Sequence, residues 1–310
     1  VLAGDVVDFL AESPAAAFTA SESEARDKLE RIFSNTRAVW DALAAHGAAG
    51  APLTLMLGNH DIELALSSSQ RALRERLGPG ATLRYDDEAL RIGELLVEHG
   101  NRHDDWNRVD HDQLRAARRA LAQGGACDFE PQPGSKLVVK VINKLKRQFP
   151  FIDLLKPETH VALPLLAWLH PQVVADLSLL GDAIESYFAM LLRSQPVRST
   201  AGRGVVQDWM LSDRALGVLR SILQDMHDDR TFDVGWEDQP YRESAEETLN
   251  DEKARAVVYG HTHLAKRVRL GGGTYLNSGT FADLMRLPDA VFQEDAAAAL
   301  EELRAFVADL

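Results

Sequence analysis

The sequence has little cysteine, no long apolar run and fewer basic than acidic residues. Its one cysteine, Cys127, cannot form a disulfide within the chain, which fits the reducing environment of the cytoplasm. No stretch approaches the roughly 18–20 uninterrupted apolar residues that a membrane-spanning helix requires. Lys and Arg number 34 against 47 Asp and Glu, and this net charge of −13 argues against a general nucleic-acid-binding protein. With 310 residues, 45% of them hydrophobic, the chain can instead bury the core of a soluble enzyme.

Four short motifs hold most of the functional information. Each places Asp, Asn or His beside a glycine, close to a β-branched or apolar run. This context is typical of a strand that ends in a tight loop, where glycine removes side-chain bulk and polar side chains can converge. The motifs are Gly4-Asp5-Val6-Val7-Asp8, Gly58-Asn59-His60-Asp61, Glu98-His99-Gly100-Asn101 and Gly260-His261-Thr262-His263. Carboxylate, amide and imidazole ligands suit two divalent transition-metal ions, which are a common apparatus for hydrolysis at phosphorus.

Each motif alone also has a simpler structural explanation. Gly-Asp after a strand is often only a turn or a helix cap, and Asp61 could be such a cap. A single histidine such as His99 more often has a structural role than a metal-binding one. The pair His261 and His263 is more specific, because residues i and i+2 of an extended segment point the same way. Taken together, the four motifs favour a metal site.

The order GD-x-x-D, GNHD, HG and GHxH resembles the calcineurin-like metallophosphoesterase superfamily. The resemblance covers about residues 1–105 and 251–287, and Asn277-Ser278-Gly279 is similar to a loop that often follows GHxH in that family. It implies an α/β (α+β) fold, in which a metallophosphoesterase β-sandwich is flanked by helices. It also implies two divalent metal ions as cofactors, which would be Mn, Fe or Zn.

The resemblance assigns a ligand role to five residues of this sequence. Asp5 would bridge the two ions, because one carboxylate has an oxygen for each. Asn59, His99 and His261 would complete the second metal site, and His263 would serve the first.

The resemblance also implies the catalytic residues. His60 would be no ligand but the general acid, standing over the substrate and stabilising the charge that develops on phosphorus. Asp8 would orient His60. The expected reaction is hydrolysis of a phosphoester or pyrophosphate bond by a hydroxide that the two metals activate, without a covalent intermediate.

One motif of the family is absent. Members of the family begin with a strand ending in D-x-H, which supplies two ligands of the first metal, whereas this chain opens at Val1-Leu2-Ala3 in what looks like the tail of the second strand. We therefore expect the sequence to be part of a longer protein. This chain alone should bind at most one metal strongly and hydrolyse phosphoesters negligibly, and an upstream strand with D-x-H should restore activity.

Apolar patterning predicts the elements around the motifs. Helical spacing predicts helices over residues 22–43, 62–77 and 294–310. Short apolar runs predict strands over residues 53–57, 82–85, 89–99, 256–259, 267–270 and 274–276, with a hairpin turn at Gly93-Glu94. The stretch between Trp106 and about residue 250 is too long for a structureless loop. We predict core parts at residues 1–105 and 251–310 that flank a mostly helical inserted cap subdomain at residues 106–250.

The predicted cap begins with an amphipathic helix. Its basic stripe is Lys136, Lys140, Lys144 and Arg147, and its apolar stripe is Val138, Ile142, Leu145 and Phe149. Such a helix can lie peripherally on an anionic membrane or meet an anionic, partly apolar substrate, but most amphipathic helices are simply half-buried. By analogy with bacterial enzymes that cleave UDP-diacylglucosamine, which this chain resembles weakly, the substrate could be a lipid-linked nucleotide diphosphate. A phosphorylated small molecule remains the alternative.

Asn101, Arg102 and Trp106 follow His99 closely and are candidate substrate contacts. Arg102 could hold a phosphate by a two-pronged hydrogen bond, or could simply belong to a solvated charged turn. Two classes of function stay open, a metal-dependent hydrolase and a non-catalytic binding or scaffold protein on the same fold. His60 discriminates between them, because a scaffold has no reason to keep it beside a full set of ligands.

Overall fold

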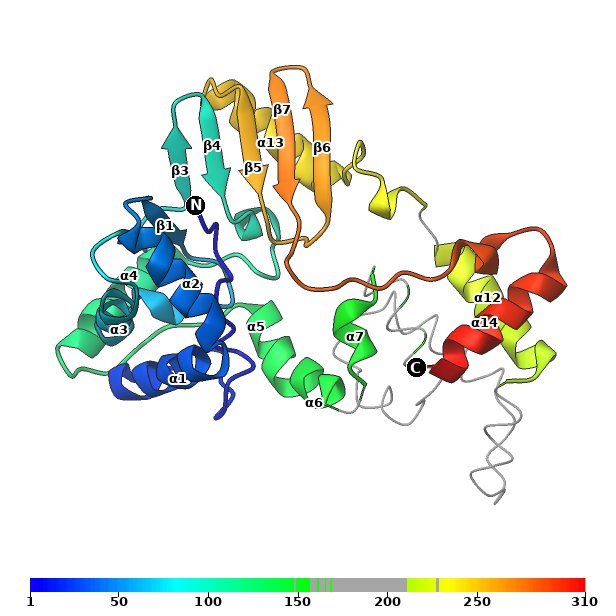
Figure 1. The fold of residues 1–310 in the computed structure, drawn as a ribbon, viewed down its shortest axis with the longest axis horizontal. Helices are drawn as coiled ribbons and strands as arrows, with labels where there is room; N and C mark the ends of the chain where they lie inside the picture. Colours follow the sequence, from blue (N-terminus) through cyan, green and yellow to red (C-terminus); the bar gives the residue numbers. More distant parts are fainter. Residues whose placement is uncertain are drawn as a thin grey trace. The chain divides into compact units, whose positions relative to one another are not determined.

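The computed structural model describes residues 1–147, 149–156, 211–226 and 229–309, and the single residues 161, 165 and 168. The chain divides into two compact units, coloured along the sequence in Figure 1. The first unit holds Val1–Asn143 and Arg230–Thr280, and the second holds Lys144–Asp229 and Phe281–Leu310. This division differs from the predicted one, because residues 106–143 and 230–250 lie in the unit of the metal motifs and residues 281–310 lie outside it. The fold is mixed α/β, with two sheets in the first unit.

A small parallel sheet positions the first two motifs. Strand β1 (Leu53–Met56) pairs in parallel with β2 (Ala81–Arg84). Leu2 adds a parallel bridge to Leu55, and its amide nitrogen donates to the carbonyl of Thr54 at 2.8 Å. Because the segment at Leu2 and strand β1 run in the same direction, the Gly4–Asp8 and Gly58–Asp61 loops leave the sheet at the same edge.

A five-stranded sheet positions the other two motifs. Its strand order is β3-β4-β5-β7-β6, and its members are β3 (Ala89–Ile92), β4 (Leu95–Glu98), β5 (Ala256–Tyr259), β6 (Ala265–Leu270) and β7 (Gly273–Ser278). The three central strands are parallel, and the two outer strands are antiparallel to their neighbours. His99 follows β4 and His261 follows β5, so both leave the carboxyl ends of adjacent parallel strands. This is the edge at which α/β sheets commonly place their ligands.

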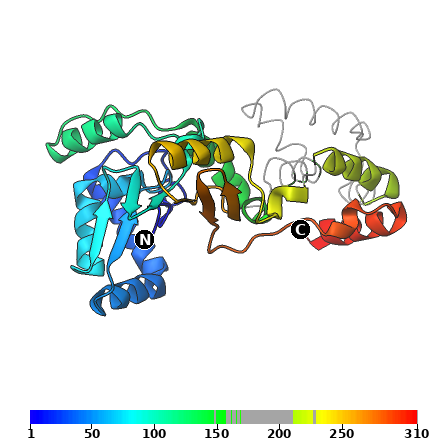
Figure 2. The same cartoon turned by 90° about the horizontal axis from the view of Figure 1, so that it is seen from above.

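Helix α13 (Gln239–Asp251) covers one face of this sheet (gold in Figure 2). Ala245 and Leu249 of the helix are buried in one cluster with Val257 and Tyr275 of the strands. The hairpin predicted at Gly93-Glu94 is confirmed, since β3 and β4 pair across it. The predicted strands over residues 256–259, 267–270 and 274–276 are also confirmed, as β5, β6 and β7.

The predicted single helix over residues 22–43 was wrong. The chain forms α1 (Glu22–Asn35) and α2 (Arg37–Ala48), with a break at Thr36. The hydroxyl of Thr36 donates to the Ile32 carbonyl at 2.7 Å and accepts from the Trp40 indole at 3.0 Å, and the Phe33 and Trp40 rings meet edge to face. Tertiary packing of two aromatic rings therefore overrides the continuous helical pattern.

Residues 62–77 also divide, because Leu66 is extended between two helical segments. The remaining helical elements of the first unit are η1 (Ile62–Ala65), α3 (Ser67–Leu77), η2 (Asn101–His103), α4 (His111–Ala122), α5 (Pro133–Leu137) and η3 (Val138–Ile142), a turn of π-helix. In the second unit, or straddling its boundary, lie α6 (Asn143–Lys146), α7 (Phe151–Leu154), α12 (Asp213–Met226), η5 (Asp229–Phe232), η6 (Asp289–Phe292) and α14 (Ala296–Asp309). The closing helix predicted over residues 294–310 is thus confirmed as α14.

The predicted basic amphipathic helix is an uninterrupted helical run over residues 133–146, made of α5, the π-helical turn η3 and α6, and Arg147 follows it in a turn. Lys136 pairs with Glu130, whereas Lys140, Lys144 and Arg147 are exposed. Much of the predicted cap between residues 157 and 210 lies outside the described residues. Among the helices that the structure describes, none combines the length and apolarity needed to cross a membrane.

Candidate metal centre

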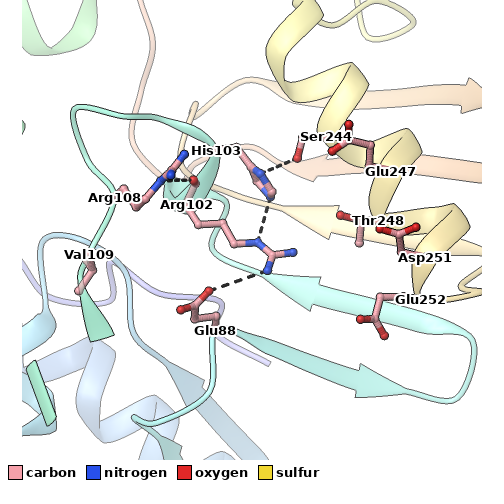
Figure 3. Close-up of a pocket in the computed structure, with 10 residues that line it drawn as sticks. All are labelled: Glu88, Arg102, His103, Arg108, Val109, Ser244, Glu247, Thr248, Asp251 and Glu252. Carbon is pink, nitrogen blue, oxygen red and sulfur yellow. Dashed lines mark hydrogen bonds and ion pairs between the residues drawn. The ribbon is translucent and has the colours of Figure 1, made fainter. Parts of the chain in front are cut away.

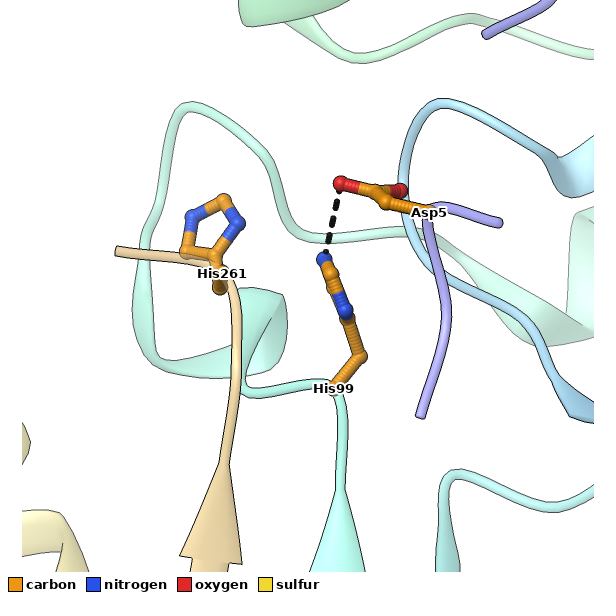
Figure 4. A group of neighbouring side chains, drawn as sticks. All are labelled: Asp5, His99 and His261. Atoms are coloured by element: carbon orange, nitrogen blue, oxygen red, sulfur yellow. Dashed lines mark ion pairs between the residues drawn. The ribbon is translucent and has the colours of Figure 1, made fainter. Parts of the chain in front are cut away.

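Asp5, His99 and His261 meet at the ends of three segments that are far apart in the sequence (Figure 4). Each offers one ligand atom, and the three atoms all lie within 4.8 Å of one another. Asn59 joins them, because its Oδ1 lies 3.2 Å from Nε2 of His99. The structure therefore brings together the four residues to which the resemblance gives the second metal site.

The atoms facing the ring nitrogens of His99 are all hydrogen-bond acceptors, so a positive charge among them would stabilise the site. Its Nδ1 lies 2.9 Å from the carbonyl oxygen of Ala3, which can only accept, so Nδ1 carries a hydrogen. Its Nε2 faces Asp5 Oδ2 at 3.0 Å and Asn59 Oδ1 at 3.2 Å, which are also acceptors. Three acceptor atoms converge at a histidine that is 4% exposed. Such an arrangement is stable only with a proton or a metal ion among them.

The charges of the site are strongly coupled. Burial acts to raise the pKa of Asp5, but His99 and His60 outweigh it and hold that pKa far below its usual range. Burial acts to lower the pKa of His99, and the Asp5 carboxylate outweighs this and raises it. The carboxylate is therefore ionised and ready to bind a cation.

A carboxylate also holds His261. Asp104 Oδ2 lies 3.1 Å from Nε2 of His261, so this nitrogen is the donor, and in the neutral tautomer Nδ1 carries the lone pair. In Figure 4 one ring nitrogen of His261 is turned toward Asp5 and the other away. Burial acts to raise the pKa of Asp104, but hydrogen bonds, first that from His261, lower it to about 2.

Two glycines let the first two motifs touch. A Cβ on Gly4 would lie 2.6 Å from the Gly58 nitrogen, and a Cβ on Gly58 would lie 2.1 Å from Asp5 Oδ1. The His60 amide donates to the same Asp5 oxygen at 2.8 Å. Only glycine allows this approach, which brings Asn59 and His60 next to Asp5.

Asp61 ties the two loops together. It is fully buried, and its two oxygens accept from the amides of Val6 at 2.7 Å and Gly58 at 2.6 Å. Burial and the Asp5 charge raise the pKa of Asp61. Asp61 is the N-cap residue of η1 by position, as its simpler structural explanation predicted, but its carboxylate makes no cap hydrogen bond there.

The ligand loops hold unusual backbone angles. Asp5, His261 and His263 have φ values of 51°, 50° and 66°, a left-handed conformation that non-glycine residues rarely adopt. Lys253 is the other such non-glycine residue in the described part of the chain. Strain of this kind concentrates where side chains must point in a fixed direction for function.

The predicted catalytic pair is in contact. His60 Nδ1 lies 3.2 Å from Asp8 Oδ1, and the same carboxylate oxygen accepts from the Leu10 amide at 3.0 Å. The His60 side chain is 27% exposed, so it can reach a bound molecule. Its backbone amide bonds to Asp5, which places it beside the metal ligands.

His263 follows His261 in the same loop. It is exposed and is not among the three residues whose ligand atoms converge. The loop that carries it is braced by Asn277, whose Nδ2 donates to the Gly260 carbonyl at 2.6 Å and to the Thr262 hydroxyl at 2.9 Å. Within the described residues, the structure therefore assembles the second predicted site and not the first.

The candidate substrate contacts lie in different settings. Arg102 pairs through Nε and Nη2 with Glu98, whose side chain is 1% exposed, at 2.5 and 3.0 Å. Its two-pronged bond thus neutralises a buried carboxylate of its own chain, while its side chain still lines a cavity of about 510 Å³ beside α13 (Figure 3). Asn101 is buried and donates to the Asn107 carbonyl at 2.9 Å, and Trp106 is half exposed.

Asp104 and Asn107 were missed from the sequence as partners of the ligands. Asp104 contacts His261, and Asn107 Oδ1 accepts from Asn59 Nδ2 at 3.4 Å. The only available signal was their position, within eight residues after His99.

The donor set fits a divalent transition-metal ion. One carboxylate, one amide oxygen and two imidazole nitrogens match the ligand preferences of Mn, Fe and Zn, which bind oxygen and imidazole ligands together.

Comparisons with models of protein families, with curated proteins and with solved structures found no match to this chain. The assignment to the metallophosphoesterase superfamily, and its β-sandwich, therefore stay predictions from the motifs.

Proposed function

We propose that this protein is a metal-dependent hydrolase of phosphoester or pyrophosphate bonds. The observation that carries the proposal is the convergence of Asp5, His99 and His261, with Asn59 against His99, at one edge of the two sheets. These four residues come from four separate motifs. Packing of a hydrophobic core gives no reason for four polar side chains to meet at one place, whereas a metal site does. The two-metal version of the proposal requires further ligands beside His263.

Each residue of the site would have a distinct task. Asp5, Asn59, His99 and His261 would hold a divalent ion, which when bound lowers the pKa of water and neutralises phosphoryl oxygens. His60, oriented by Asp8 at 3.2 Å, would donate its proton to the leaving oxygen. Its ring is partly exposed, so a bound substrate can reach it.

The runner-up is a non-catalytic binding protein on the same fold. Such a protein would use the metal ligands without a proton donor, so the His60–Asp8 contact favours the enzyme. The proposed substrates are a phosphorylated small molecule or, as the alternative, a lipid-linked nucleotide diphosphate.

The test separates metal binding from chemistry. We expect the 310-residue chain to bind one Mn²⁺ ion in calorimetry. A longer form, made by adding a strand that ends in D-x-H before Val1, should bind two ions and hydrolyse aryl phosphates. His60→Ala in the longer form should keep its metal and lose on the order of 10²–10⁴-fold in rate on a poor leaving group, as expected for a lost general acid. Asp5→Ala should lose metal and rate together.

Either of two results would contradict the proposal. One is a chain that binds no Mn²⁺, Fe²⁺ or Zn²⁺, and the other is an activity that survives both chelation and Asp5→Ala. A longer form that binds metal with all ligands intact but hydrolyses no phosphoester would favour the binding protein.

A further inference from the structure

The segment from Asp104 to Asn107 lies beside the metal ligands without belonging to them. We propose that Asp104 is a positioning residue that fixes the tautomer and direction of His261, and that Asn107 does the same for the amide of Asn59. This inference rests on the proposed metal site and extends it from the ligands to the loop that holds them.

The first arm is the contact between Asp104 and His261. A carboxylate oxygen 3.1 Å from Nε2 requires a hydrogen on that nitrogen, and in the neutral imidazole this leaves the Nδ1 lone pair for an ion. A free histidine samples both tautomers and several ring orientations, so a fixed one lowers the entropy lost on metal binding. Carboxylates that accept from a ligand histidine also raise its basicity.

Asp104 is itself held in place. Its Oδ1 accepts from the Trp106 amide at 2.9 Å, and its Oδ2 accepts from Asn107 Nδ2 at 2.7 Å. The amide of Asn107 also donates to the Asp104 carbonyl at 3.0 Å. These bonds leave the carboxylate few other orientations, so it can direct the His261 ring rather than follow it.

The second arm passes through Asn107. Its side-chain nitrogen goes to Asp104, and its Oδ1 accepts from Nδ2 of Asn59 at 3.4 Å. Because the nitrogen of Asn59 points at Asn107, its Oδ1 must point at His99. The orientation of this amide decides whether the site offers an oxygen or an N–H to an ion, and only the oxygen can bind one.

The loop is anchored on both sides. Asn101 Nδ2 donates to the Asn107 carbonyl at 2.9 Å, and the Gly134 amide donates to the Trp106 carbonyl at 2.8 Å. A Cβ on Gly134 would lie 2.2 Å from Asn107 Oδ1, so only a glycine at the amino end of α5 leaves room for that side chain where it lies.

Asp105 provides a matched control. It has the same chemistry as Asp104 and is adjacent to it, but its side chain is 89% exposed and pairs with Arg108 at the surface. A change of charge at this position leaves the contacts to both ligands intact.

The experiment compares Asp104→Asn, Asp104→Ala and Asp105→Asn in the full chain. Mn²⁺ affinity is measured by calorimetry, and the histidine tautomers of the metal-free protein are measured by long-range proton–nitrogen NMR. We expect Asp105→Asn to match the wild type. Asp104→Ala should bind Mn²⁺ about 10–100-fold more weakly, with Asp104→Asn between the two. His261 should be the Nε2–H tautomer in the wild type and a mixture in Asp104→Ala.

Asp104→Ala with wild-type affinity and an unchanged His261 tautomer would overturn the inference. If that variant does not fold, Asp104→Asn decides by the same two readouts. A wild type that binds no Mn²⁺ would contradict the proposed function first, and the tautomer spectra would still decide whether Asp104 directs His261.

Discussion

Gly58→Ala is the substitution that tests most simply whether the two motif loops must touch. The new Cβ would lie 2.1 Å from Asp5 Oδ1, 2.5 Å from the Asp5 nitrogen and 2.7 Å from its Cγ. One of these atoms belongs to the backbone, so rotation of the Asp5 side chain cannot relieve the clash. The loops must instead separate until the contact reaches an ordinary van der Waals distance.

The magnitude follows from what the separation breaks. To reach about 3.4 Å from the Asp5 nitrogen the Cβ must move by about 0.9 Å, and overpacking of this kind costs about 1–3 kcal/mol. The hydrogen bond from the His60 amide to Asp5, now 2.8 Å, would lengthen beyond a useful distance, as would that from Val6 to Asp61. We expect lower stability and a separate loss of metal affinity, because Asn59 moves with its loop.

Urea unfolding in chelator gives the stability, and calorimetry with Mn²⁺ gives the affinity. Gly271→Ala is the control, since a Cβ there meets nothing within 4 Å and the residue has no positive φ. We expect the control to match the wild type in both measurements, and Gly58→Ala to bind Mn²⁺ at least tenfold more weakly.

Equal Mn²⁺ affinity in Gly58→Ala and Gly271→Ala would refute the reasoning. It would mean that the ion does not need Asp5 and Asn59 at the distance that the structure gives them.

Two predictions concern pH. In the first a neighbouring charge raises the pKa of the group, and in the second burial raises it. Asp5 raises the pKa of His99 against the effect of burial, so the metal-free site holds a proton that an ion must displace. Mn²⁺ affinity should fall as the pH falls below that pKa, by up to about tenfold per pH unit. Calorimetry in buffers of different ionisation enthalpy should show the released proton. An affinity that does not change with pH would contradict this prediction. Burial raises the pKa of Glu63 from 4.5 to about 7, so the folded chain holds this proton more tightly than the unfolded chain. The protonated carboxyl contributes its full stabilisation below about pH 4.5, and on the order of 3 kcal/mol is lost as the pH rises to about 7. In urea unfolding at pH 5 and pH 8, Glu63→Gln should remove this change in the free energy of unfolding with pH. An unchanged pH dependence in the variant would show that Glu63 is ionised throughout.

The sequence predicted the convergence of the ligands because its signals are local. A glycine beside a polar residue at a strand end marks a tight loop, and parallel strands bring such loops to one edge. The structure gathers Asp5, Asn59, His99 and His261 accordingly.

Features that depend on tertiary partners could not be read in the same way. The break at Thr36 follows from the packing of Phe33 on Trp40, although the helical pattern continues through it. Arg102 was a candidate either for a phosphate contact or for a solvated charged turn, and neither alternative included its pairing with the buried Glu98. The partner of His261 is Asp104, from a loop 157 residues earlier in the chain, and no spacing rule connects the two.

Anomalous diffraction from crystals of this chain soaked in Mn²⁺ tests the central claim most directly. The account predicts a peak at the Mn edge among Asp5, Asn59, His99 and His261, at about 2.0–2.3 Å from the Nε2 of His99. It also predicts that Nε2 and Asp5 Oδ2, 3.0 Å apart without metal, are no longer hydrogen-bonded to each other. No peak at saturating Mn²⁺, with that hydrogen bond intact, would contradict the metal centre itself.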